Sequence, residues 1–256
     1  MARGKWASGL SIILRKPELL KAMSENRFHY ATRTIAAVLS LWLFPSFMNG
    51  QTASELRDSL KQAADRLAFH PDSTDLRLKK AAFNIRLEQW QYALEEYDYI
   101  LARDKYNPAA LFYRAYVNEK LSRDNFARLD YERLLTVVPG HFEAQLGLAL
   151  LNQKDKRFTE ALDQINRLVG QYPHNAVGYA ARAGIEREQK MYGLAAFDFE
   201  EAMKLDPDNI DYALDHIDVL ISNGELAAAR KELLALQKKG VPQSGIRRYF
   251  ERLKGK

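Results

Sequence analysis

The stretch that decides the fold runs from Ala176 to Asn209 and reads AVGYAARAGIEREQKMYGLAAFDFEEAMKLDPDN. It is 34 residues long, and its pattern recurs along the chain at the same spacing. Four sets of equivalent positions share this period: Pro139, Pro173 and Pro207; Ala93, Ala127, Ala161, Ala195 and Ala229; Ala81, Ala115, Ala149 and Ala183; and Tyr97, Tyr131, Ile165, Phe199 and Leu233. A period of this length indicates an array of repeated structural units.

Each repeat divides into two helices. Ala195, Phe199 and Ala202 are spaced i, i+4, i+7 and so share one helix face, while residues 177–189 form the helix before them. Small residues at Ala183 and Ala195 allow the two antiparallel helices to approach closely. Pro207 then ends the second helix because proline donates no amide hydrogen and clashes with the preceding turn, and Asp208 or Asn209 can cap the next helix.

This motif resembles the tetratricopeptide repeat (TPR) family. The matching features are a small residue at Ala183, Ala195 twelve positions later, an aromatic residue at Phe199 and the closing Asp-Pro-Asp-Asn at 206–209. The resemblance covers residues 74–241, which make five repeats. It implies an all-α fold, an α-solenoid of antiparallel helix pairs wound as a TPR superhelix. The family favours a large residue four places into each repeat, and the residues at this place here are Arg77, Leu111, Gln145, Tyr179 and Ala213.

Two further helices are expected at the ends of the array. Residues 52–69 place Leu56, Leu60, Ala63 and Leu67 on one face, so residues 51–73 are read as an N-terminal capping helix. After Gly240 and Pro242, residues 244–253 gather Ile246, Tyr249, Phe250 and Leu253 on one side. We therefore assign residues 242–256 to a C-terminal capping helix with a basic tail.

Residues 1–50 precede the array and have the pattern of a secretory signal peptide. Arg27 and Arg33 are followed by the apolar run 34–44, then by Pro45 and Gly50. About 20 apolar residues are needed to span a bilayer, so the run favours a cleaved signal with the mature chain beginning near Gln51. An uncleaved membrane anchor through residues 34–48 is the alternative. Because signal peptides rarely have long preambles, Met23 is a second candidate for the start of translation.

Charge and composition exclude several classes of function. The chain has 256 residues, a net charge of +5 and no cysteine, so it has no disulfides and no thiolate metal sites. Residues 1–50 account for the whole excess of positive charge, which makes nucleic-acid binding by the array a poor reading. No phosphate-binding loop, helical zinc pair or catalytic constellation is present. We expect no enzymatic activity, no cofactor and no metal.

The TPR resemblance implies a concave surface lined by the first helix of each repeat. Transferring the family's positions gives a partner-binding groove with these members: Tyr113, Tyr116, Lys120, Gln153, Lys154, Arg187, Asp215 and Asp218. Repeats two to four would present cations and repeat five would present the two aspartates. Tyrosine and arginine are typical of binding hot spots, although Tyr113 or Tyr116 packing between repeats is the competing reading.

The function that follows is a non-catalytic protein–protein interaction scaffold of the periplasm or cell envelope, holding a peptide or protein partner. The alternative is a structural subunit of a larger envelope assembly, or a chain that assembles with itself as a homo-oligomer.

Overall fold

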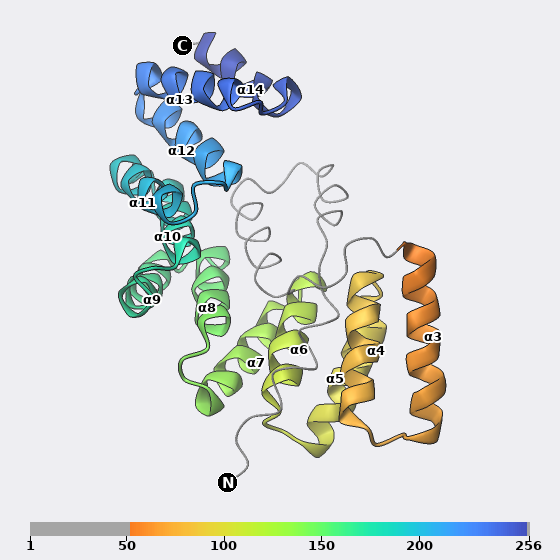
Figure 1. Ribbon diagram of the computed structural model, residues 1–256. Coiled ribbons are helices and arrows are strands. Elements are labelled where there is room, and N and C mark those ends of the chain that lie inside the picture. The colour runs from red at the N-terminus through yellow and green to blue at the C-terminus, as the bar shows by residue number, and fades with distance from the viewer. Residues whose placement is uncertain (1–51, 255–256) are drawn as a thin grey trace. The chain divides into compact units, whose positions relative to one another are not determined.

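The computed structural model describes residues 52–254, and the predicted signal segment, the candidate start at Met23 and Gln51 lie outside this part. The described chain is entirely helical and contains no strand, as predicted (Figure 1). Its helices are α3 (Ala53–Phe69), α4 (Thr74–Arg86), α5 (Trp90–Arg103), α6 (Pro108–Lys120), α7 (Asp124–Val137), α8 (Phe142–Lys154), α9 (Phe158–Gln171), α10 (Ala176–Glu188), α11 (Tyr192–Leu205), α12 (Ile210–Asn223), α13 (Leu226–Lys238) and α14 (Gln243–Lys254).

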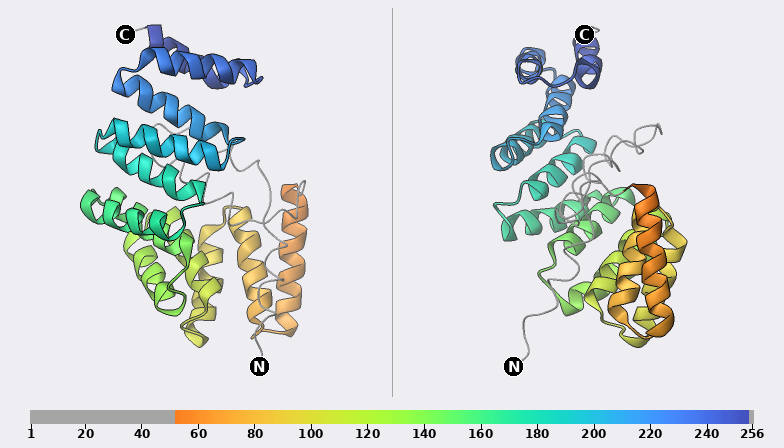
Figure 2. Two further views of the ribbon diagram at one scale, coloured as in Figure 1. Left: turned by 60° about the vertical axis from the view of Figure 1, so that its left-hand side comes forward. Right: turned by 45° about the vertical axis from the view of Figure 1, so that its right-hand side comes forward.

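These helices belong to two compact units that divide within α8. The first unit contains described residues 52–148, and the second contains residues 149–254. Within each unit, the two helices of a repeat lie antiparallel and successive pairs pack against each other (Figure 2). The predicted array of antiparallel helix pairs is therefore confirmed.

The first helix of every repeat begins at a side-chain cap. The backbone amides of Leu76, Ala110, Ala144, Val177 and Asp211 donate to the side chains of Ser73, Asn107, His141, Asn175 and Asn209, respectively, at 2.9–3.4 Å. The caps are 34 residues apart, so the period of the sequence is also the period at which helices start. Asn209, rather than Asp208, is the residue that caps α12.

The turn between the two helices of a repeat uses a left-handed residue, with φ between 56° and 86°, at equivalent positions: Glu88, Ser122, Lys156, Lys190 and Gly224. The next residue's amide reaches back to a carbonyl in the last turn of the first helix, as Met191 does to Glu186 at 2.9 Å. This is the Schellman ending, in which glycine is the preferred residue. Four of the five repeats hold this turn with a side chain in place.

Small residues lie where the paired helices meet. Ala183 and Ala195 have no exposed surface, and Phe199 is 1% exposed beside them. The equivalent alanines of the other repeats are equally buried, and Tyr97 and Tyr131 take the place of Phe199. Close approach at alanine with one large neighbour is therefore the packing rule of the repeat, as the sequence predicted.

A series of polar pairs also runs through the interior. Arg182 on α10 donates two hydrogen bonds to the buried Asp198 on α11, at 2.6 and 2.7 Å, and a third to Asn166 on α9. Arg114 does the same with Asp130 and Asp98. Equivalent positions hold Lys80 with Glu96 and His216 with Glu232. Each pair joins the two helices of one repeat, and two of the cations also reach the preceding repeat.

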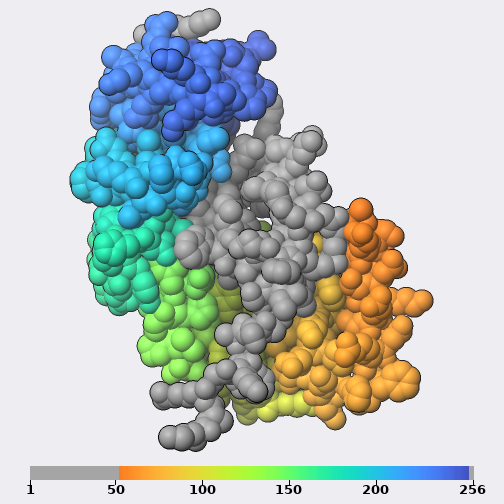
Figure 3. All heavy atoms as spheres, in the orientation of Figure 1, coloured from red at the N-terminus to blue at the C-terminus, as the bar shows by residue number. Residues whose placement is uncertain are grey.

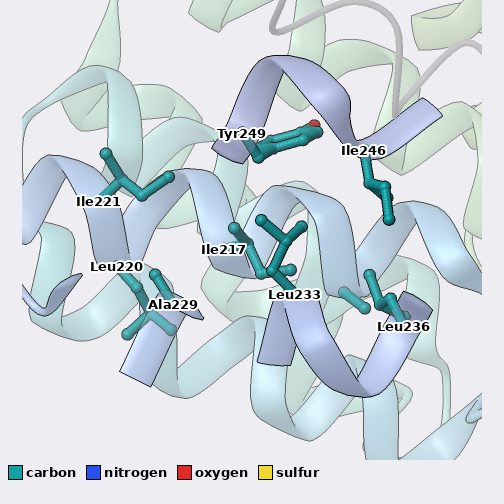
Figure 4. Packing of buried hydrophobic residues seen from close by; sticks show 9 residues of the cluster. Ile217, Leu220, Ile221, Ala229, Leu233, Leu236, Ile246 and Tyr249 are labelled. Carbon is teal, nitrogen blue, oxygen red and sulfur yellow. The ribbon is translucent and has the colours of Figure 1, made fainter. Parts of the chain in front are cut away.

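The terminal helices close the two units. Thr52 caps α3 through a reciprocal capping box with Glu55, and Leu56 and Ala63 pack against Ala82 and Phe83. Figure 3 shows the side chains of α3, in orange, at the surface. At the other end, Ile246 and Tyr249 of α14 lie in a cluster with residues of α12 and α13, including Ile217 and Leu233 (Figure 4).

Candidate functional site

The candidate surface in the first unit lies on α6. Tyr113 and Tyr116 are about one turn apart, and both are half-buried. The ring of Tyr113 stacks on Tyr97, with 6.1 Å between ring centroids and 14° between planes. Burial raises the pKa of Tyr113 to about 12, with a smaller contribution from the negative charge of Glu143. Tyr113 therefore stays a neutral phenol across the physiological range.

Tyr116 is held by an aromatic contact and a cation. Its ring meets the edge of Trp90 at 6.3 Å between centroids, and the Lys120 Nζ atom lies 5.1 Å from the ring centre. Burial lowers the pKa of Lys120, although the nearby negative charges of Glu119 and Glu88 oppose this. The structure thus brings Tyr116, Trp90 and Lys120 together as one patch at the end of α6, which we call the Tyr116 patch.

In the second unit, the predicted residues Gln153 and Lys154 differ in burial. Gln153 is 6% exposed, and its amide nitrogen donates to Glu188 at 2.7 Å. The side chain of Lys154, the next residue, is exposed. Gln153 therefore ties the end of α8 to the end of α10, while Lys154 lies at the surface.

The remaining three predicted residues form an ion-pair cluster. Arg187 on α10 lies 3.0 Å from Asp215 and 3.7 Å from Asp218 on α12, and Asp218 also pairs with Arg252 of α14. The expectation of cations in repeats two to four and a separate acidic end in repeat five was therefore wrong for Arg187. The guanidinium groups of Arg187 and Arg252 together balance the two carboxylates, so this end of the surface offers a partner little net charge.

Sequence reasoning missed a buried carboxyl, Glu186, which is 6% exposed. Burial raises its pKa to about 7, and the negative charge of Asp198 acts in the same direction. One of its carboxyl oxygens has no hydrogen-bond partner among the described residues. The sequence does indicate a polar site at this position. The equivalent residues of the first three repeats are asparagines, and all three are buried: Asn84, Asn118 and Asn152.

Two absences apply to residues 52–254. No group of three or more histidine, aspartate or glutamate side chains there is placed to hold a metal ion. None of the described helices combines the length and the apolarity that crossing a membrane requires.

The capped helix pairs, the left-handed turns and the 34-residue period define a helical-repeat protein. Residues 127–176 match the model of the tetratricopeptide repeat family. This segment is therefore similar to a tetratricopeptide repeat, and proteins built from such repeats are generally non-catalytic scaffolds for protein–protein interaction. No curated protein sequence matches the chain.

Several solved structures share the fold at low sequence identity. A tetratricopeptide repeat protein from Parabacteroides merdae is 17% identical with a TM-score of 0.63, over 93% of this chain and 90% of that one. PilW, described as a widely conserved type IV pilus biogenesis factor, is 15% identical with a TM-score of 0.66, over 83% and 94%. MamA from Desulfovibrio magneticus is 18% identical with a TM-score of 0.58, over 65% and 94%.

Proposed function

We propose that the protein is a non-catalytic scaffold of the periplasm or cell envelope that holds a protein or peptide partner on the first helices of its repeats. The observation that carries this proposal is the Tyr116 patch, where two aromatic rings and a lysine with a lowered pKa meet at a half-buried surface. Aromatic side chains held by their neighbours lose little entropy on binding and are typical of hot spots.

The exported location is supported by the residue pattern of 33–50 and is compatible with a structural neighbour named for pilus biogenesis. The uncleaved segment 34–48 would instead anchor the same scaffold to the membrane. In both cases the repeats would act outside the cytoplasm.

The eight residues of the predicted groove contribute to the partner surface in two different ways. Tyr113, Tyr116, Lys120 and Lys154 supply aromatic and cationic contacts. Gln153, Arg187, Asp215 and Asp218 are engaged with one another or with their neighbours, so they shape the surface more than they attract a charged ligand. We expect a partner segment with apolar residues and an acidic residue that meets Lys120.

The test is site-specific crosslinking in cells. A photoreactive residue replaces Tyr116 in one strain and Tyr92 in a matched control, since Tyr92 is a tyrosine on α5 that is 60% exposed. A protein crosslinked from position 116 and absent from position 92 is then purified and titrated against the wild type and Tyr116→Ala. Loss of about thirtyfold in affinity is expected for removal of a tyrosine hot spot. Equal capture at both positions, or unchanged affinity, would contradict the proposal.

A further inference from the structure

Two helices expose apolar side chains in the same pattern. Phe126, Leu129 and Val137 on α7 are 61%, 56% and 41% exposed. On α11, Leu194, Phe197 and Leu205 are 57%, 56% and 38% exposed, and each lies 68 residues after its counterpart, which is two repeats. Their spacing of i, i+3 and i+11 places each trio on one helix face, as a stripe about 17 Å long.

The fold does not require these stripes. On α9, which lies between α7 and α11 in the sequence, the equivalent positions are Glu160, Asp163 and Gln171. The same place in the repeat is therefore compatible with a fully polar surface. Large exposed apolar groups that recur at one register indicate an interaction site rather than a packing need.

Each stripe has a charge at its centre, and the two charges are opposite. Arg133 lies one turn after Leu129 and one turn before Val137. Glu201 occupies the same place between Phe197 and Leu205. We name the two sets the α7 stripe (Phe126, Leu129, Arg133 and Val137) and the α11 stripe (Leu194, Phe197, Glu201 and Leu205).

We propose that the α7 stripe of one copy of this chain binds the α11 stripe of a second copy. When the two helices are placed side by side, Arg133 faces Glu201. The apolar residues one turn before and after Arg133 then contact the apolar residues one turn before and after Glu201. This holds for parallel and antiparallel directions alike, because both stripes are apolar on both sides of the charge. Contact between two α7 stripes would oppose two arginines, and contact between two α11 stripes would oppose two glutamates, which is unfavourable.

The surroundings of the two charges favour this pairing. Arg133 lines a cavity of about 510 Å³ together with Lys105, Arg114 and Asp98. Arg114 and Asp98 form an ion pair at 2.7 Å, so a carboxylate arriving there still meets the cations Arg133 and Lys105. Glu201 is paired with Lys204 at 2.6 Å within its own helix, but Lys204 is largely exposed. Exposed pairs of this kind contribute little, so the arginine of a second copy can replace Lys204.

The contact is heterologous, since it joins two different surfaces. After one contact, one copy retains a free α11 stripe and the other a free α7 stripe, and assembly therefore continues unless it closes into a ring. The surface is separate from the Tyr116 patch, so self-association and partner binding can be tested independently.

Charge exchange tests the central pair. The full chain is studied by sedimentation velocity, as wild type, Arg133→Glu, Glu201→Arg and the double variant with both changes. Each single reversal is expected to raise the dissociation constant at least about tenfold, and the double variant to restore most of the association. A double variant weaker than both single variants would overturn the pairing of Arg133 with Glu201.

Mixing tests the heterologous arrangement. Leu129→Asp blocks the α7 stripe, and Phe197→Asp blocks the α11 stripe. Each variant alone should be monomeric, while an equimolar mixture should form a dimer, because one copy keeps an intact α11 stripe and the other an intact α7 stripe. Leu234→Asp is the matched control, since Leu234 on α13 is 49% exposed and lies outside both stripes, and it should associate like the wild type.

Three results would overturn the proposal. The first is a wild-type chain that stays monomeric at about 100 μM, a concentration at which weak specific contacts are populated. The stripes would then bind a different protein and not a second copy of this chain. A Phe197→Asp variant that still dimerises alone would show contact between α7 stripes. Retained association in both blocked variants would place the self-contact elsewhere on the chain.

Discussion

Replacing Glu186 with glutamine should stabilise the protein at high pH and have little effect at low pH. Glu186 is buried beside Asp198, and its pKa rises from an ordinary 4.5 to about 7 in the folded chain. Between these two values the folded state holds a proton that the unfolded state has lost. The free energy of unfolding therefore falls as pH rises through this window, and the loss is complete above pH 7.

The size of the effect follows from the two pKa values. Each tenfold change in the proton equilibrium corresponds to about 1.4 kcal/mol, so the ionised Glu186 destabilises the folded state by up to about 3 kcal/mol at pH 8. Glutamine has no charge and still has an amide hydrogen to donate to Asp198. The same arrangement exists in repeat three, where the Asn152 amide donates to Gln164 at 2.9 Å.

The assay is urea unfolding followed by far-ultraviolet circular dichroism at pH 4, 6, 7 and 8, with the difference between Glu186→Gln and wild type as the result. This difference should be near zero at pH 4 and grow to between about 1 and 3 kcal/mol at pH 8. Asn118→Asp supplies the mirror experiment, since it places a buried carboxyl at the equivalent position and should lose stability as pH rises. A difference that does not change with pH would refute the reasoning.

Four further outcomes are expected. Ala195→Trp should cost at least about 1 to 3 kcal/mol in a fully buried contact, measured by urea unfolding, whereas Trp at the exposed Ala228 should cost less than about 0.5 kcal/mol. Lys190→Gly should raise the free energy of unfolding by about 0.5 to 1 kcal/mol, because Lys190 has a φ of 60° that glycine adopts without strain. Tyr116→Ala should weaken partner capture while changing the melting temperature by only a few degrees. N-terminal sequencing of protein from cells should find a chain that begins at or near Gln51, and an intact segment in the membrane fraction would favour the anchor.

The helices could be predicted from the sequence because their signals are local. Alanine spacing, Pro207 and the capping Asn209 act within a few residues of the features they determine, so the period fixes where each helix starts and ends. The left-handed turn was less visible in the sequence, because Lys190 is an exposed lysine and glycine, the residue that usually indicates such a turn, is absent there.

The candidate surface could be predicted only in part because it depends on helix rotation and on partners in other repeats. Arg187 meets Asp215 across 28 residues, and Asp218 meets Arg252 across 34, so neither pair is a local pattern. A helix turned by one residue would have placed these side chains apart. The sequence thus indicated which residues lie on the first helices, but not which of them neutralise each other.

Hydrogen bonds from the buried polar pairs also connect successive repeats of the same period. Exchanging an ion pair such as Arg182 with Asp198 for apolar residues would change stability little, whereas leaving one partner alone in the interior costs several kcal/mol. Each pair lies within one repeat, but Arg114 also donates to Asp98 and Arg182 to Asn166 of the preceding repeat, so a repeat docked on the wrong neighbour would lose this additional hydrogen bond. We infer that the bonds from Arg114 and Arg182 to the preceding repeat contribute specificity of stacking more than stability.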